Sequence, residues 1–154
     1  MATFKGYFEL KTPADLLQKL AYDLARIQAA PLDTYACFDF FITAEHMLDW
    51  LYPDDVIALQ NKRLSETLLK VCSHLANGAK HFHARNRQHT SVTDTEKHDG
   101  PFDDSFDGSF DTCGLVVHLD GDAAKKYGPE IDAEELAELV FAYWQKDLAA
   151  KKLL

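Results

Sequence analysis

Apolar residues recur at helical spacing over long stretches of the chain, and this pattern favours a mainly helical fold. In the first stretch they follow one another at intervals of four, four and three, on one helix face: Leu16, Leu20, Leu24 and Ile27. Thr12 followed by Pro13 is typical of a helix start, and Pro31 of a helix end. The sequence therefore predicts a helix from Pro13 to about Ala30.

A second helix is predicted from Tyr35 to Leu51, with Asp33 as its N-cap and Pro53 beyond its end. Because this segment is apolar on nearly all sides, we expect it to lie at the centre of the fold, packed on several neighbours. The polar residues of the segment share one stripe: Asp39, Thr43, His46 and Asp49. Any of these side chains that is buried needs a hydrogen-bond partner.

A third helix is predicted to begin near Asp54 or Asp55 and to continue, with a bend around Asn61, to about Phe82 or Arg85. Its apolar residues form a seam that repeats about every seven residues. Polar residues and a glycine line up beside this seam, within about 60° of one another around the helix axis. They are His74, Asn77, Gly78, His81 and Arg85.

The helical pattern disappears between residues 86 and 127, and a loop this long in a compact domain has a functional or insertional reason. Within it, the β-branched segment Cys113–Leu119 is predicted to be a strand. Residues 88–93 are its best candidate partner in a small antiparallel ribbon. We therefore expect an irregular, acidic, β-containing insertion here.

A last helix is predicted from Asp132 to about Lys151, opened by a capping box between Asp132 and Glu135. The 154 residues are thus expected to form one domain, a mainly α, four-helix up-and-down bundle with a β-ribbon inserted between the third and fourth helices. One end of this bundle is expected to be covered by the N-terminal apolar residues Phe4, Tyr7, Phe8 and Leu10.

The formal net charge of −9 is concentrated in one segment, because residues 94–122 hold nine acids against Lys97 alone. The rest of the chain is close to neutral, and the decapeptide 80–89 contains bases and no acid. The two segments can neutralise each other, or the basic one can meet a phosphate-bearing ligand. The three cysteines, without CxxC spacing, predict neither a disulfide framework nor a structural zinc site. Without a long apolar run or a signal peptide, we expect a cytoplasmic protein.

The most unusual segment of the chain is the stretch 76–82, Ala-Asn-Gly-Ala-Lys-His-Phe, in the predicted third helix. Glycine destabilises a helix interior by about 1 kcal/mol relative to alanine, so Gly78 indicates a close approach by another group. Two interpretations remain open. Asn77 and His81 belong to a buried network that fixes helix packing, or they form part of a ligand site.

The helical pattern, together with the Asn-Gly-Ala-Lys-His-Phe stretch, resembles the HEPN group of small helical bundles. This resemblance implies a domain that binds nucleotides or RNA and, as in toxin-like members, cleaves RNA without a metal. Active members share an Arg, a polar residue and then a His after a gap of four to six residues. In this chain, Arg85 and His89 are separated by three residues.

Metal-free RNA cleavage needs a base near a ribose hydroxyl and a cation at the phosphate. His81 or His89 can titrate for the first role, and Arg85 suits the second because its donors match phosphate oxygens. Lys80 can help to hold the RNA backbone. The hypothesis therefore assigns His81 and Arg85 to catalysis and four residues to ligand binding, without a cofactor: Asn77, Lys80, His74 and His89.

Two metal sites are alternatives. A calcium loop is suggested by alternating oxygen ligands and a glycine at the turn, although its twelfth position is Gly114 instead of a glutamate. Its candidate ligands are Asp103, Ser105, Asp107, Ser109 and Asp111. A solvated acidic turn explains the same residues. A transition-metal site inside the bundle could use Asp39, His46, Asp49, His74 and His81.

Motifs of the common enzyme classes are absent from the sequence, among them the phosphate loop, the dinucleotide-binding glycines, the nucleophile elbow and HExxH. A non-enzymatic interaction module, dimeric through exposed aromatic residues, is therefore the alternative to nucleotide or RNA binding. Trp50, Tyr52 and Tyr143 are the candidates for such a surface.

Overall fold

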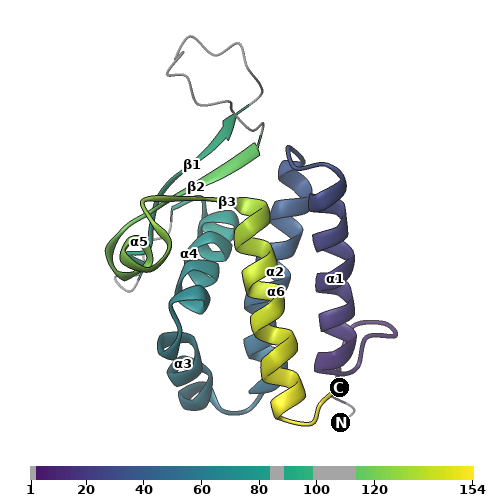
Figure 1. The fold of residues 1–154 in the computed structure, drawn as a ribbon. Coiled ribbons are helices and arrows are strands. Elements are labelled where there is room, and N and C mark those ends of the chain that lie inside the picture. The colour runs from purple at the N-terminus through teal and green to yellow at the C-terminus, as the bar shows by residue number, and fades with distance from the viewer. Residues whose placement is uncertain (1–2, 84–88, 99–113) are drawn as a thin grey trace.

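The computed structural model describes residues 3–83, 89–98 and 114–154. Four long helices in this part of the chain run alongside one another (Figure 1): α1 (Pro13–Ala29), α2 (Thr34–Leu51), α4 (Thr67–His81) and α6 (Ala133–Ala150). Two shorter helices accompany them, α3 (Val56–Ser65) and α5 (Gly121–Tyr127). An antiparallel sheet in the order β1-β2-β3 lies against one end of the four long helices: β1 (Val92–His98), β2 (Gly114–Leu119) and β3 (Glu130–Asp132).

Helix α1 begins and ends close to where the sequence predicts. The Thr12 hydroxyl accepts the backbone N–H of Asp15 at 3.2 Å, and the Asp15 carboxylate accepts the backbone N–H of Thr12 at 2.8 Å. These bonds satisfy donors that the first helical turn leaves without partners. The Asp15 carboxylate also accepts the Lys11 N–H and the Thr12 hydroxyl, and these bonds, together with the one from the Thr12 N–H, lower the pKa of Asp15.

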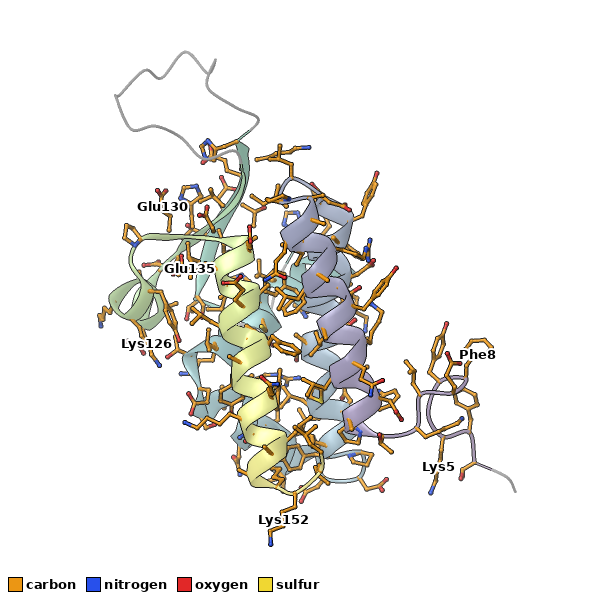
Figure 2. All side chains as sticks on the ribbon, turned by 45° about the vertical axis from the view of Figure 1, so that its right-hand side comes forward. Lys5, Phe8, Lys126, Glu130, Glu135 and Lys152 are labelled. Atoms are coloured by element: carbon orange, nitrogen blue, oxygen red, sulfur yellow. The ribbon has the colours of Figure 1, made fainter. Side chains whose placement is uncertain are left out.

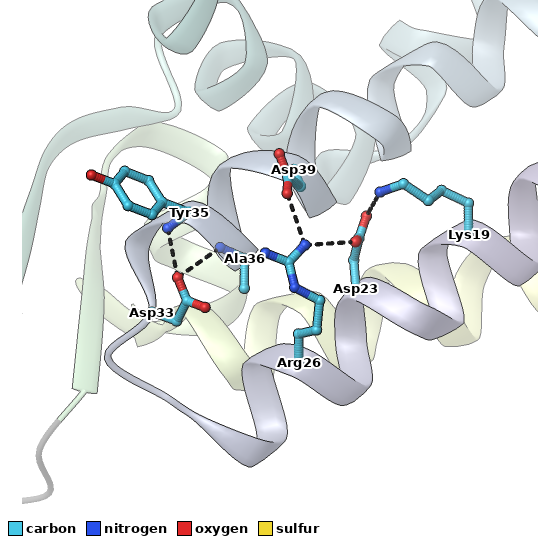
Figure 3. Close-up of polar contacts among 7 residues, drawn as sticks. All are labelled: Lys19, Asp23, Arg26, Asp33, Tyr35, Ala36 and Asp39. Atoms are coloured by element: carbon cyan, nitrogen blue, oxygen red, sulfur yellow. Dashed lines mark hydrogen bonds and ion pairs between the residues drawn. The ribbon is translucent and has the colours of Figure 1, made fainter.

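Asp23 is an acid that is fully buried on α1, and two cations bind it (Figure 3). Lys19 pairs with one carboxylate oxygen, and Arg26 Nη1 donates to the other at 3.1 Å. The same Arg26 nitrogen donates to Asp39 Oδ2 on α2 at 2.8 Å. The predicted polar stripe of α2 thus divides: Asp39 bonds to α1, whereas His46 and Asp49 are exposed.

Helix α2 contacts α1, α3, α4 and α6, which confirms its predicted central place. Its buried side chains meet fully buried residues of the other long helices, and burying each leucine-sized side chain contributes about 1.5–3 kcal/mol. The core comprises, among others, Leu20, Ile27, Phe40, Met47, Leu48, Leu69, Val71, Leu136, Val140, Trp144 and Leu148.

The predicted third helix is two helices, so the expectation of one helix bent at Asn61 is wrong. Glu66, with φ −130° and ψ 132°, is extended and separates α3 from α4. The Ser65 hydroxyl donates to the Lys62 carbonyl at 2.7 Å, a local bond that competes with helix continuation. Side-chain pairs also hold α3 in place: Lys62 binds Asp147 on α6, and Arg63 binds Glu45 on α2.

The insertion is only partly as predicted, and the fold is not a clean four-helix bundle. Strand β2 coincides with the predicted strand, but its partner β1 spans Val92–His98 and overlaps the expected segment 88–93 at two positions. A third strand and helix α5 follow, where the sequence predicts neither. The α5 segment is too short to show helical periodicity, and its start depends on Asp120, whose carboxylate accepts the Gly121 N–H at 2.7 Å.

Two further predictions fail, one at the start of α6 and one in the N-terminal segment. Asp132 precedes α6 but its side chain caps nothing, because this residue pairs with Val116 in the sheet. The N-terminal aromatic side chains project away from the helices instead of covering them, and Phe4 and Phe8 are 88% and 75% exposed (Figure 2). The N-terminal segment closes on itself through two backbone bonds between Tyr7 and Leu10.

None of the helices in the described ranges is both long and apolar enough to cross a bilayer.

Candidate binding cleft

A cleft of about 570 Å³ lies between the sheet and the adjoining ends of α2 and α4. Its volume is in the range of small-molecule sites, about 300–1,000 Å³, which are mostly apolar and largely preformed. Most of the side chains that line it are apolar as well, among them Cys37, Phe38, Phe41, Leu75, Leu115 and Val117.

One wall of the cleft follows strand β1, because all six residues from Val92 to Lys97 line it. The opposite wall is the C-terminal half of α4, where Gly78, Ala79 and Phe82 line the cleft. A Cβ added to Gly78 would meet no atom within 4 Å. The prediction of a close approach at Gly78 is therefore wrong, since this glycine enlarges an open space.

Phe82 ends α4 at the mouth of the cleft with a φ of +65°, which is unusual for a residue with a side chain. Its N–H donates to the Gly78 carbonyl at 2.8 Å, and the next N–H, of His83, donates to the His81 carbonyl at 2.7 Å. Such a γ-turn is strained, and strained residues cluster at functional sites. The turn leaves the Phe82 ring 87% exposed, edge-on to the His83 ring.

His74 lies at the other end of the α4 wall and connects the cleft to the sheet. Its Nδ1 accepts the backbone N–H of Val92 at 3.1 Å, so this nitrogen carries no proton. The His89 ring lies 5.1 Å away, centroid to centroid. Burial and the neighbouring His89 lower the pKa of His74, while burial and the positive charge of Arg63 lower the pKa of His89. Both imidazoles are therefore neutral near pH 7.

An ion pair between Glu45 and Arg63 lies near these histidines. The two side chains are 14% and 13% exposed, and Arg63 Nη1 also donates to Gln60 at 3.0 Å. Burial raises the pKa of Glu45 although Arg63 opposes this effect. Because Arg63 is already paired with Glu45, its charge holds α3 against α2 and is not available to bind a phosphate.

The cysteine beside the cleft is not an activated nucleophile. Burial, with smaller effects from Asp33 and Glu134, raises the pKa of the Cys37 thiol to about 11, so the reactive thiolate is scarce at neutral pH. Cys72 is fully buried on α4, and burial raises the pKa of its thiol well above the ordinary value. Both behave as small buried hydrophobic residues, while Cys113 lies outside the described residues.

The predicted site residues separate into two groups. His74 lines the cleft and His89 lies beside it, so the structure brings these two together. Asn77 is half-buried, whereas Lys80 and His81 are exposed, and none of these three lines the cleft. Arg85 lies outside the described residues. So do all candidate calcium ligands, Asp103, Ser105, Asp107, Ser109 and Asp111.

The proposed transition-metal residues do not form a site in the part of the chain that the structure describes. No three histidine, cysteine, aspartate or glutamate side chains there are placed to hold one ion. Asp39 pairs with Arg26, and the Nδ1 of His74 is used by Val92.

Several cleft residues escape the sequence prediction, notably Phe38, Thr95 and Leu115. Of these residues, only Phe38 could have been found from the sequence, because it is an aromatic residue on the side of α2 opposite the main apolar face. It is 47% exposed because it borders the cleft instead of the core.

Searches against protein-family models, curated proteins and solved structures find no match to this chain.

Proposed function

We propose that the protein is a non-catalytic binding module whose cleft receives an apolar group of its ligand. The observation that carries this proposal is the cleft itself, a preformed space of about 570 Å³ with Phe38, Phe41 and Leu75 among its walls. Apolar walls with a few polar groups at the rim are typical of binding sites. The space at Gly78 adds to it, since a side chain there would occupy the site.

The chemistry of the surrounding residues supports binding over catalysis. The Cys37 thiol is held protonated, Arg63 is neutralised by Glu45, and His74 uses Nδ1 to hold β1. A nucleophile or base needs a free reactive atom next to its substrate. None of these three side chains offers one at the cleft.

Filling the cleft tests this function. Gly78→Phe places a ring in open space, so the protein should fold while losing most of its binding of the apolar dye anilinonaphthalene sulfonate. Ala142→Phe, at an exposed position on α6, is the matched control and should bind the dye as the parent protein does. Dye fluorescence and methyl chemical shifts of Leu115 and Val117 report the result. Undiminished binding by Gly78→Phe, with unperturbed methyl signals, would contradict the proposal.

Nucleotide or RNA binding, as implied by the HEPN resemblance, is a second candidate. One observation favours it: Lys80, His81 and His83 are exposed and lie next in sequence to the exposed ring of Phe82. Cations beside an aromatic ring are a common arrangement for binding single-stranded nucleic acid, through phosphates and base stacking.

Anisotropy titration with a labelled single-stranded RNA, at low and moderate salt, tests the second candidate. Lys80→Ala should weaken binding and reduce its salt dependence, while Lys125→Ala, which removes an exposed lysine of α5, should not. RNA cleavage in EDTA tests the catalytic form of the hypothesis. Equal cleavage by the parent protein and the His81→Ala/Arg85→Ala variant would exclude it.

The homodimer expected from the sequence also belongs to this proposal. The side chains predicted for its surface, Trp50, Tyr52 and Tyr143, are only partly exposed and pack against the core. Its support is instead the N-terminal segment, where Phe4, Tyr7 and Phe8 are exposed within the stretch 4–8. Exposed apolar groups that gather in this way are typical of association surfaces. Sedimentation should give a dimer for the parent protein and a monomer for Phe4→Ser/Phe8→Ser; a monomeric parent protein would contradict it.

A further inference from the structure

A side-chain bond joins the two walls of the cleft at one end. Strand β1 packs on α4, and β2 and β3 pack on α6 (Figure 1). At the start of β1, the Nδ1 atom of His74 on α4 accepts the Val92 N–H at 3.1 Å. His74 and Val92 both line the cleft. This bond therefore sets the separation of the walls at the place where the cleft begins.

Protonation of His74 breaks this bond. A neutral imidazole has one acceptor nitrogen, whereas an imidazolium has two donors and no acceptor. A proton on Nδ1 would point at the Val92 N–H, so that two donors would face each other. Val92 is partly buried against the core, where an N–H group without an acceptor is costly. The start of β1 must then move away from α4.

The groups around His74 oppose its charge and do not compensate for it. Burial and the neighbouring His89 lower the pKa of His74, and burial and Arg63 on α3 lower the pKa of His89. Arg63 in turn is paired with Glu45 on α2. Helix α5 also packs on α4, and its charged side chains are exposed: Asp122, Lys125 and Lys126.

The same protonation range leaves the sheet paired. His118 on β2 lies with its Nε2 2.7 Å from Glu96 Oε2 on β1 and with its Nδ1 3.8 Å from Glu130 Oε2 on β3. A protonated His118 would form an ion pair with each neighbouring strand, which is a weak but stabilising effect at this exposed face. The Ser91 carbonyl accepts the Asp120 N–H at 2.9 Å, and neither of these backbone groups titrates.

We infer that protonation of His74 switches binding at the cleft: the neutral imidazole holds β1 against α4 around an apolar ligand, and acid releases both the strand and the ligand. This inference rests on the proposed function and adds its regulation. A ligand that binds only the closed form opposes the uptake of the proton. One proton can therefore raise the dissociation constant by at most about tenfold per pH unit.

A neutral apolar dye measures the release without a charge of its own. N-phenyl-1-naphthylamine should bind the parent protein at about pH 7.5, and its dissociation constant should rise at least about fivefold by about pH 5. Circular dichroism should show that the helices are retained over this range. A constant affinity would overturn the inference. Loss of the helical signal together with the dye would also overturn it, because the protein would then unfold globally.

The variant His74→Asn separates this histidine from other titrating groups. Asparagine offers an acceptor oxygen close to the position of Nδ1 and does not titrate. Whatever its affinity at about pH 7.5, this variant should change by less than about twofold by about pH 5. His46→Asn, at an exposed histidine of α2 outside the cleft, is the matched control and should keep the full change. Full pH dependence in His74→Asn would assign the effect to another group, such as His83, and would overturn the inference.

Hydrogen exchange locates the released segment. The protection factor of the Val92 amide should fall as the nitrogen-15 chemical shift of His74 Nδ1 reports its protonation. The Leu119 and Asp120 amides donate to Pro129 and Ser91 and should stay protected, because the sheet remains paired. Val92 protection that does not follow the charge of His74 would overturn the inference.

The inference and the proposed function can fail separately. If the neutral dye binds the parent protein and Gly78→Phe removes it, while pH has no effect, the cleft is a binding site and only the switch is wrong. If Gly78→Phe leaves dye binding intact at both pH values, the cleft is not the site and both proposals are wrong.

Discussion

His74 on α4 holds the first residue of β1, since its Nδ1 accepts the Val92 N–H at 3.1 Å. One imidazole nitrogen thus joins the helices to the sheet at the place where the cleft begins. The bond exists only while Nδ1 is unprotonated. Attachment of the edge strand is therefore linked to the charge of this histidine.

We predict that stability falls as the pH is lowered from about pH 7 to about pH 5. The pKa values of His74 and His89 are lowered in the folded protein, so the unfolded chain binds more protons below its ordinary pKa near 6.5. Their contribution is present above that value and is lost as the pH falls through it. Urea denaturation across this range measures the effect. The His74→Asn/His89→Gln variant should show a flatter profile, and an equally steep one would assign the loss to other groups.

Gly78→Ala is expected to raise the free energy of unfolding by about 1 kcal/mol. The residue lies inside α4, and the added methyl group meets nothing within 4 Å. Urea denaturation monitored by circular dichroism measures the change. A loss of stability would mean that the space beside Gly78 is occupied in the folded protein.

Arg63→Met is expected to lower the free energy of unfolding by about 3 kcal/mol, because it leaves the buried Glu45 carboxylate without its cation. The double variant Arg63→Met/Glu45→Met should recover most of this loss, since it removes both charges. Denaturation of the two single variants and the double variant gives the coupling between the residues. Additive losses would show that the pair contributes nothing beyond packing.

Phe4→Ser/Phe8→Ser is expected to change monomer stability by less than about 0.5 kcal/mol. Both rings are mostly exposed and lie outside the core, in a segment that projects from the helices. Thermal unfolding at protein concentrations that keep the chain monomeric measures this. A loss of several degrees would place these rings against the bundle, as the sequence suggests.

Features set by neighbouring residues could be predicted from the sequence. The start of α1 depends on Thr12, Pro13 and Asp15, which lie within one helical turn, and β2 is a short β-branched run. The break at Glu66 could not be predicted in the same way. It coincides with α3 being held by Asp147, which lies 85 residues beyond Lys62 in the sequence.

The candidate site was predictable only in part. The sequence singles out α4 and gives His74 and His89, because polar residues and a glycine in a helix are locally visible. Of the predicted polar stripe, His74 and Gly78 line the cleft beside Leu75, whereas Asn77 and His81 do not. This division depends on where β1 and β2 lie, and the strands reach α4 through tertiary contacts that no local pattern encodes.

The position of α6 between α1 and the sheet has a consequence for biosynthesis. Trp144, wholly enclosed, is supplied by α6, and Gln28 on α1 bonds to Glu138 across 110 residues of sequence. While a ribosome is still translating the sheet, the inner sides of α1 and α2 therefore lack their cover. A nascent chain at that stage exposes the apolar faces of these helices, and the core can pack completely only after α6 has been synthesised.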